Sequence, residues 1–337
     1  MYLQPRRGVV DVNAFAVEFS PFHEHWVAVG AAQYFGLVGN GKQYVMELLP
    51  SGELTPMRCF DTQHGIFDVA WSETHPNQLV AGCSNGDLKL FDVTTRDNFP
   101  IQAFSEHTMD VSGVNWNLVD RQTFCSSSLD HTIKVWHPQR RESLTTLRGH
   151  TGPVNNAVWS TRETNLLASC SRDGALKLWD LLAPTQAVGH IAAHAQEVLA
   201  LDWNKYNPNQ LVSGSVDATI KVWDIRNPSM EVRLLRGHQL PVRRIKCSPH
   251  DEHLIGSTSY DMSVRLWNTQ AVHPHVVRYV IPASTTIQCA NHHSEFVMGL
   301  DFSLFVPGIV ASCSWDRRVV LWNHMGGPPP PVVPPTI

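Results

Sequence analysis

The amino-acid sequence predicts an all-β fold, a single domain in which seven four-stranded blades form a closed β-propeller. Three observations predict it. A tryptophan closes a similar segment five times, short apolar runs of strand length fill each segment, and His, Ser and Asp stand at fixed distances from each tryptophan. Self-similarity at a constant period is the sequence signature of repeated structural units.

The repeated tryptophans are 43, 44, 44 and 55 residues apart, close to the period of WD repeats. An aspartate lies six residues before each tryptophan, a serine four residues before each aspartate, and a histidine 23 residues before it. The five sets are His107, Ser126, Asp130 and Trp136; His150, Ser169, Asp173 and Trp179; His194, Ser213, Asp217 and Trp223; His238, Ser257, Asp261 and Trp267; and His293, Ser312, Asp316 and Trp322. We expect each set to form a hydrogen-bond chain inside its own blade.

Two further segments complete the ring. One has the strand pattern but carries Thr62, Ala81, Asn85 and Phe91 at the four positions, and a more divergent one precedes it. The expected blades are residues 13–48, 62–92, 107–137, 150–180, 194–224, 238–268 and 293–323, in a propeller spanning 1–325 that is followed by a proline-rich tail, 326–337. Each blade is completed by a weaker outer strand.

The last blade is expected to take its outer strand from the N-terminal residues. Glycines and prolines follow soon after Trp322, and proline cannot donate a hydrogen bond to a β-ladder. Residues around 7–12 are therefore expected to pair there, so that residues 1–12 close the ring. Closure protects sheet edges from pairing with other chains.

The sequence contains the residue types of a hydrolase triad, for example His150, Ser169 and Asp173. An active site needs one set in one pocket, whereas this set occurs five times at constant spacing, so we expect a structural role and no enzyme. The sequence has no glycine-rich phosphate loop and no HExxH pattern, and its seven cysteines stand singly. Neither a cofactor nor a metal site is expected.

The composition of the sequence limits the classes of partner and the compartment that can be expected. The formal net charge of −4 gives no basic footprint for nucleic acid. No apolar run approaches the length of a membrane span, and the N-terminal residues lack the apolar core of a secretory signal. Unpaired cysteines suit a reducing compartment. We expect a cytoplasmic protein with no direct membrane span and no nucleic-acid partner.

One mouth of a propeller is surrounded by the loops that enter the first strand of each blade and by the turns before each third strand. Repeat positions place apolar and acidic side chains there, including Phe15 and Met298 at positions expected to face solvent. An apolar surface with acidic points suits an amphipathic helix carrying a few basic residues. The predicted peptide-binding residues are Phe67, Asp68, Asp110, Leu129, Glu197, Leu199, Tyr260, Phe296 and Trp315.

Several runs outside the repeat framework carry a closer resemblance. They are residues 66–73 (IFDVAWSE), 201–207 (LDWNKYN), 242–249 (VRRIKCSP), 259–268 (SYDMSVRLWN), 299–304 (GLDFSL) and 314–316 (SWD). These runs resemble the WD-repeat peroxins, over nearly the whole chain. The resemblance implies a receptor for the type 2 peroxisomal targeting signal, an N-terminal helix of cargo proteins. It also implies a co-receptor peroxin, a peroxisomal docking complex, and cycling between the cytoplasm and an ordinary or a specialised peroxisome.

The sequence departs from that family in three places: the second blade lacks the polar set, the stretch 269–292 is long, and the tail is proline-rich. The roles of this stretch and of the tail stay open. A different class of function also stays open, a WD-repeat scaffold subunit of a chromatin or ubiquitin-ligase complex that binds a basic peptide. The ligand discriminates the two, because a cargo signal binds as a helix and a tail binds extended.

Overall fold

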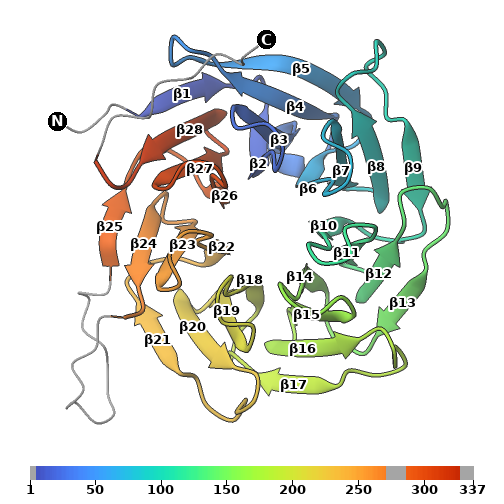
Figure 1. Cartoon of the computed structure of the whole chain (residues 1–337), viewed down its shortest axis with the longest axis vertical. Helices are drawn as coiled ribbons and strands as arrows, with labels where there is room; N and C mark the ends of the chain where they lie inside the picture. The colour runs from blue at the N-terminus through green and yellow to red at the C-terminus, as the bar shows by residue number, and fades with distance from the viewer. Residues whose placement is uncertain (1–4, 271–285, 327–337) are drawn as a thin grey trace.

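A computed structural model of the chain describes residues 5–270 and 286–326. Seven four-stranded antiparallel sheets surround a central axis (Figure 1). The predicted fold class, a seven-bladed propeller, is confirmed. Among the described residues the only helical element is a single 3₁₀ turn, Tyr34–Gly36, and no helix has the length and apolarity to cross a membrane.

The first four blades follow one another along the chain, each with its first strand innermost. Blade 1 contains β2 (Asn13–Phe19), β3 (Trp26–Ala32), β4 (Gly41–Leu48) and β5 (Leu54–Thr62). Blade 2 contains β6 (Ile66–Trp71), β7 (Gln78–Cys83), β8 (Asp87–Asp92) and β9 (Gln102–Ser105). Blade 3 contains β10 (Val111–Trp116), β11 (Phe124–Ser128), β12 (Thr132–Trp136) and β13 (Thr145–Arg148). Blade 4 contains β14 (Val154–Trp159), β15 (Leu166–Ser171), β16 (Ala175–Asp180) and β17 (Gly189–Ala192).

The remaining three blades close the ring. Blade 5 contains β18 (Val198–Trp203), β19 (Gln210–Ser215), β20 (Thr219–Asp224) and β21 (Arg233–Arg236). Blade 6 contains β22 (Val242–Cys247), β23 (Leu254–Ser259), β24 (Val264–Asn268) and β25 (Thr286–Ala290). Blade 7 contains β26 (Val297–Phe302), β27 (Ile309–Ser314) and β28 (Arg318–Asn323), and its outer strand is β1 (Arg6–Val9).

Ring closure by an N-terminal strand is confirmed. β1 pairs antiparallel with β28, from Arg6 opposite Leu321 to Val9 opposite Arg318, slightly before the predicted stretch. Val10 follows the strand and is buried in the core shared by blades 7 and 1. Most of the long stretch 269–292, and the tail after Gly326, lie outside the described residues.

The core consists of apolar clusters between neighbouring blades. In blades 3 to 7 the tryptophan at or next to the end of the third strand packs on the preceding blade. Trp179 of blade 4, for example, lies with Ile133 and Leu147 of blade 3. In blade 2 the same place is taken by Phe91, which is fully buried with its ring centroid 4.9 Å from that of Phe60 in blade 1. A smaller aromatic side chain therefore fills this position without an indole.

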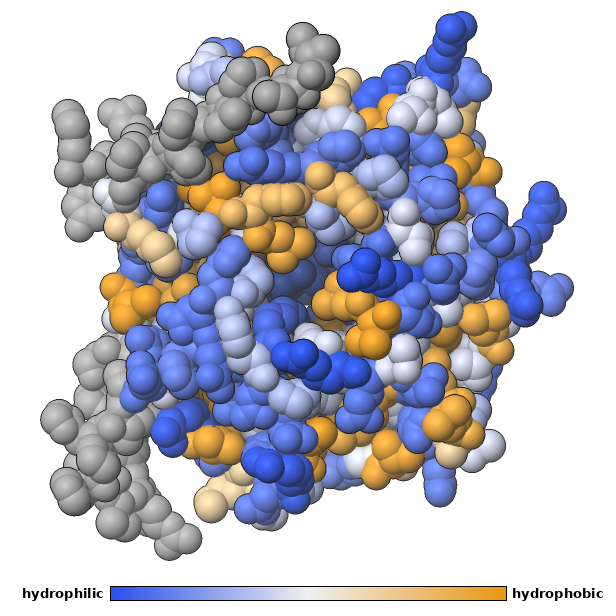
Figure 2. Space-filling view, in the orientation of Figure 1, coloured by the Kyte–Doolittle hydropathy of each residue, from blue (hydrophilic) through white to orange (hydrophobic). Residues whose placement is uncertain are grey.

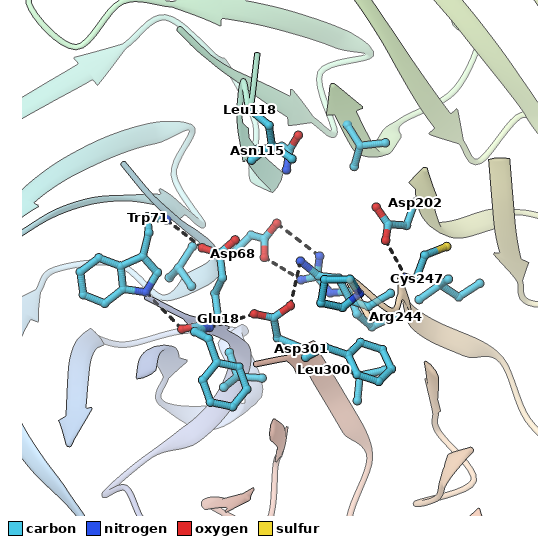
Figure 3. A pocket seen from close by; sticks show the side chains of 18 of the residues that line it. Glu18, Asp68, Trp71, Asn115, Leu118, Asp202, Arg244, Cys247, Leu300 and Asp301 are labelled. Carbon is cyan, nitrogen blue, oxygen red and sulfur yellow. Dashed lines mark hydrogen bonds and ion pairs between the residues drawn. The ribbon is translucent and has the colours of Figure 1, made fainter. Parts of the chain in front are cut away.

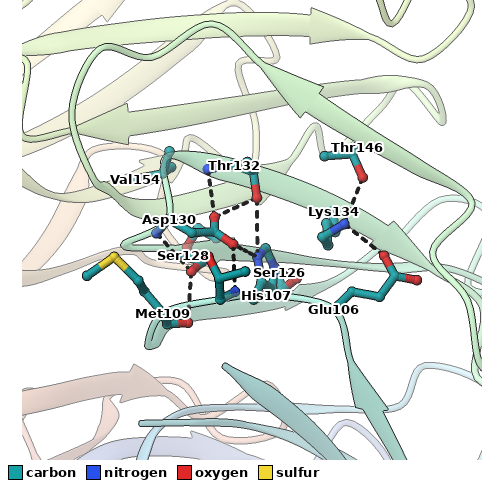
Figure 4. A network of polar contacts seen from close by, with 12 residues as sticks. Glu106, His107, Met109, Ser126, Ser128, Asp130, Thr132, Lys134, Thr146 and Val154 are labelled. Carbon is teal, nitrogen blue, oxygen red and sulfur yellow. Dashed lines mark hydrogen bonds and ion pairs between the residues drawn. The ribbon is translucent and has the colours of Figure 1, made fainter. Parts of the chain in front are cut away.

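The polar set of blade 3 forms one hydrogen-bond chain, of which Figure 4 shows His107, Ser126 and Asp130. His107 donates from Nδ1 to Asp130 at 2.8 Å, Ser126 lies 2.8 Å from His107 Nε2, and Trp136 donates from its indole to the Ser126 hydroxyl at 2.8 Å. Burial raises the pKa of Asp130, but hydrogen bonds from His107 and Thr132 outweigh it and hold that pKa well below its usual value. This hydrogen-bond network connects the loop before the first strand of the blade to the turn before its third strand.

The same chain occurs in blades 4, 5 and 6. Ser169, Ser213 and Ser257 each accept from the blade tryptophan and contact the blade histidine. In blade 7 the histidine contacts Asp316 at 3.1 Å and Ser312 at 2.9 Å, but the prediction for Trp322 is wrong. Its indole nitrogen is buried without a hydrogen-bond partner among the described residues, and the ring packs edge-on to His292 at 5.6 Å.

Candidate functional site

The innermost strand of every blade contains a β-bulge near its start, at the second residue of the strand in blades 2 to 7 and at the third in blade 1, shown by a register shift between the residues on either side. A bulge redirects a side chain out of the alternating pattern of a strand. The seven bulged residues form a ring at one mouth of the propeller: Phe15, Phe67, Ser112, Asn155, Leu199, Arg243 and Met298. Four are apolar and three are polar.

The loops around this mouth are joined by a backbone hydrogen bond that recurs in six blades. The residue before the blade Asp, or before Asn85 in blade 2, donates its N–H to a carbonyl in the loop that enters the first strand. The donor and acceptor pairs are Ser84 and Gly65, Leu129 and Asp110, Arg172 and Pro153, Val216 and Glu197, Tyr260 and Pro241, and Trp315 and Phe296, at 2.9 to 3.1 Å. We call the surface formed by these loops and the bulged ring the loop face.

An aromatic cluster occupies one sector of the loop face, over blades 6, 7, 1 and 2. Tyr260 stacks on Phe296 with centroids 4.8 Å apart, and Phe296 lies 5.2 Å from Trp315. Phe15 lies 5.6 Å from Trp315 and 5.1 Å from Phe67. The structure therefore brings together four predicted binding residues, three from loops (Tyr260, Phe296 and Trp315) and one from the bulge of β6 (Phe67).

Two expectations about this sector are wrong. Phe15 and Met298 do not face solvent, because they are only 5% and 3% exposed and form the floor of the cluster. Their side chains support the partly buried rings of Phe67, Phe296 and Trp315 from below.

Sequence reasoning missed the turn between β3 and β4. Tyr34 and Phe35 are exposed residues with φ of 46° and 59°, a region that side-chain-bearing residues rarely adopt. Phe35 packs on Trp315 at 5.2 Å. Asn13 holds this turn by accepting from the Phe35 N–H and donating to the Trp315 carbonyl. Leu37 and Val38 beside it are 84% and 65% exposed, so the turn extends the aromatic cluster outward.

Two half-buried carboxylates lie in the other sector of the loop face, on blades 3 and 5. Glu197 accepts from Asn155 at 3.0 Å and lies 3.7 Å from the mostly exposed Arg172. Burial raises the pKa of Asp110, whose carboxylate has no ion-pair partner among the described residues. Leu129 and Leu199, both partly buried, lie on the same two blades. This sector offers negative charge beside apolar surface.

The prediction that Asp68 helps to receive a basic residue on the loop face is contradicted. Asp68 is 5% exposed and is paired across the channel with Arg244 of blade 6, at 2.7 and 3.3 Å. It also accepts the backbone N–H of Val114 at 3.0 Å. Both carboxylate oxygens are therefore engaged, and no oxygen is left for a ligand at the mouth.

Within the described residues, no group of three or more His, Cys, Asp or Glu side chains is placed to hold a metal ion. The triad-like residues are likewise committed to the blade interiors. Ser126 and its four counterparts are fully buried, beneath the turns. The fold and the loop face together define a propeller whose loops from several blades build one composite surface.

The chain belongs to the WD domain, G-beta repeat family, whose model matches residues 98–137, 141–180, 185–224, 229–268 and 284–323. It is also similar to curated proteins named peroxisomal targeting signal 2 receptor. The one from Saccharomyces cerevisiae is 38% identical over 200 residues, 51% of this chain and 53% of the relative. Those from Dictyostelium discoideum and Homo sapiens are 42% identical over 132 residues and 36% identical over 158 residues. These cover 39% and 47% of this chain and 42% and 48% of the relatives. The chain thus spans about half the length of these relatives, and the resemblance read from the sequence is confirmed.

Proposed function

We propose that this chain is an import receptor that binds the N-terminal type 2 peroxisomal targeting signal of matrix proteins. With a co-receptor peroxin and the peroxisomal docking complex, it delivers these cargo proteins from the cytoplasm to the peroxisome and returns. The observation that carries the proposal is the composition of the loop face, an aromatic cluster beside unpaired or weakly paired carboxylates, in a chain similar to proteins named as such receptors. The function is binding rather than turnover.

The signal expected from the family resemblance has basic and apolar residues on one side of a short helix. Asp110 and Glu197 are proposed to receive the basic residue, and Arg172, which is largely exposed, would be displaced from Glu197 at little cost. Phe67, Leu129, Leu199 and Trp315 receive the apolar residues. Tyr260 and Phe296 complete the aromatic surface.

Binding by this chain alone is expected to be weak. A helix of about nine residues is barely stable in water, so the complex must offset the cost of ordering it. A second protein that covers the exposed side of the helix removes more apolar surface from water and strengthens the complex. This is the role proposed for the co-receptor.

The test is a titration of a fluorescent signal peptide with wild type, Glu197→Lys and Trp315→Ala, with and without the co-receptor. Loss of one partner of a partly buried charge pair costs roughly 2 to 5 kcal/mol, about 30-fold to several thousand-fold in affinity. Trp315→Ala is expected to cost at least as much, because binding energy concentrates in a few desolvated side chains.

Two matched controls lie away from the loop face. Glu163→Lys makes the same charge change on an exposed turn between the first and second strands of blade 4, and Phe99→Ala removes an aromatic ring that is 71% exposed outside the ring of blades. Neither should change affinity. Unchanged binding by both loop-face variants would refute this surface as the cargo site. Full affinity without any co-receptor would refute the proposal that a second protein covers the exposed side of the helix.

A further inference from the structure

A pocket fills the part of the channel on the other side of the Asp68 and Arg244 pair (Figure 3). It is lined by the later residues of the innermost strands and by the turns that follow them, including Pro21, Leu118, Pro249 and Leu304. It therefore opens toward the face opposite the loop face, made by the turns between first and second strands. We call this the turn face.

The layer of side chains at the pocket's inner end separates it from the loop face. Asp68 and Arg244 span the channel there and are buried, with Asn156 beside them in the lining. The buried pair therefore lies between the pocket and the loop face, and the pocket is distinct from the proposed cargo surface.

The pocket lining has more negative than positive groups, five carboxylates against Lys205, Arg244 and Lys246. Each of the three cations already has a carboxylate partner: Asp202 at 2.8 Å, Asp68 at 2.7 Å and Asp301 at 3.4 Å, respectively. Glu18 and Glu73 are the two acids of the lining with no ion pair among the described residues.

Glu18 is the acid best placed to receive a ligand. Its Oε2 accepts the Trp71 N–H at 2.7 Å, and its Oε1 has no hydrogen-bond partner among the described residues. Figure 3 shows Glu18, Asp68 and Asp301 together on one side of the pocket and Asp202 on the other. The equivalent strand position in blade 4 carries Val158, an uncharged residue of the lining.

The turns around this opening carry exposed apolar side chains. They are Phe22, Leu118, Val119, Tyr206, Leu304 and Phe305, each between 38% and 48% exposed. Figure 2 shows one face of the ring hollowed at its centre, with apolar side chains beside charged ones around the hollow. Exposed apolar groups around a pocket with two carboxyl groups that have no ion pair among the described residues are the surface that a basic side chain with apolar neighbours complements.

We propose that this pocket binds a lysine or arginine side chain that a partner polypeptide inserts from the turn face, while the partner's neighbouring apolar residues rest on the rim. The cation binds at Oε1 of Glu18, and its aliphatic stem lies against Leu118, Val158 and Leu304. The partner is a protein segment with one basic residue among apolar ones. This site is additional to the loop face and does not depend on the proposed cargo function.

Protonation of Glu18 provides a second readout. Burial raises the pKa of Glu18 to about 8, with Lys246 lowering it and Asp301 and Asp68 raising it. The carboxyl group is therefore mostly protonated at pH 7, and an inserted cation favours its ionised form. Binding releases a proton, so affinity rises from pH 6.5 to 8.5, while a peptide lysine stays protonated across this range.

The experiment titrates the full chain with two labelled peptides, each blocked at both ends. One has a single central lysine among alanines and leucines, and the other has norleucine in its place, which keeps the stem and removes the ammonium. We expect the norleucine peptide to bind about fivefold more weakly. For comparison, 1.4 kcal/mol corresponds to a tenfold difference in affinity. Glu18→Gln, which can still accept from Trp71, should remove both this preference and the pH dependence.

A second variant tests the rim without touching the core. Leu118→Ser with Leu304→Ser should weaken both peptides to the same extent, since both residues are exposed. Equal affinity for the two peptides, or a preference that survives Glu18→Gln, would overturn the proposal. So would loss of lysine-peptide binding in Trp315→Ala but not in Glu18→Gln, which would move the site to the loop face. Loss of signal-peptide binding in Trp315→Ala tests the cargo proposal separately.

Discussion

Asp173→Ala is expected to destabilise the protein by about 2 to 5 kcal/mol, a value that follows from the donors it leaves unpaired. Asp173 accepts from His150 Nδ1 at 2.8 Å, from the Thr151 N–H at 3.0 Å and from the Ala175 N–H at 3.0 Å. The His150 side chain is 0% exposed, so its donor has no access to water once Asp173 is removed. The loss of an acceptor for the His150 N–H lowers the free energy of unfolding by about 1 to 3 kcal/mol. The two turn amides, which are partly solvated, add about 0.5 to 1 kcal/mol each.

Asn85→Ala at the equivalent position of blade 2 is the matched control. Asn85 is exposed and its side chain bonds only with Asp87, two residues away, so its loss should cost within about 0.5 kcal/mol. Asp173→Asn keeps an acceptor for His150 without the charge and should fall between wild type and Asp173→Ala.

Thermal unfolding, followed by circular dichroism or calorimetry, measures the difference. A loss of 1 kcal/mol lowers the Tm of a domain of 150 to 250 residues by roughly 2 to 4 °C and that of a longer domain such as this one by less, so Asp173→Ala should lower it by about 3 to 8 °C. Equal shifts for Asp173→Ala and Asn85→Ala would refute the role assigned to the blade network.

Three other substitutions test the fold and its charges. Val10→Ala should cost about 1 to 3 kcal/mol in urea unfolding, whereas Val9→Ala on the exposed side of the closing segment should cost almost nothing; equal costs would argue against closure by this strand. Asp68→Leu should cost about 3 to 5 kcal/mol by leaving Arg244 buried and unpaired, and adding Arg244→Leu should recover most of it, with signal-peptide affinity unchanged by the double substitution. Burial raises the pKa of Asp217, but hydrogen bonds from His194 and Thr219 bring it down to about 2. The stability that this carboxylate provides is therefore complete above about pH 4 and is lost as the pH falls toward 2. The difference in unfolding free energy between wild type and Asp217→Ala should narrow over that range, and a constant difference would exclude this link between protonation and stability.

The ring and four of the five blade networks were predictable because they follow from spacing within one repeat. The exception, Trp322, has the right spacing but lies in the last blade, whose outer strand comes from the other end of the described chain. Spacing fixes which strand a residue occupies. It does not fix the position of its indole relative to a serine on the neighbouring strand.

The Asp68 and Arg244 pair could not be predicted in this way. The two residues are 176 positions apart, on blades 2 and 6, and only the closed ring brings them together. The turn with Tyr34 and Phe35 was missed for a different reason, because blade 1 is the most divergent repeat and offers no repeat position to compare. The exposed apolar run from Tyr34 to Val38, interrupted by glycine, was the available signal.

The geometry of the innermost strands explains why one propeller can present two unlike surfaces. The bulge near the start of each strand turns the bulged residue toward the loop face, whereas in every blade except blade 2 the residue three positions later lines the pocket that opens on the turn face. Leu199 and Asp202 of blade 5, and Met298 and Asp301 of blade 7, show this division within single strands. The buried pair of Asp68 and Arg244 lies between the two levels. Binding at the loop face and at the turn face should therefore respond to separate sets of residues. With both ligands present, the changes in binding free energy caused by Trp315→Ala and by Glu18→Gln should then be additive in the double variant.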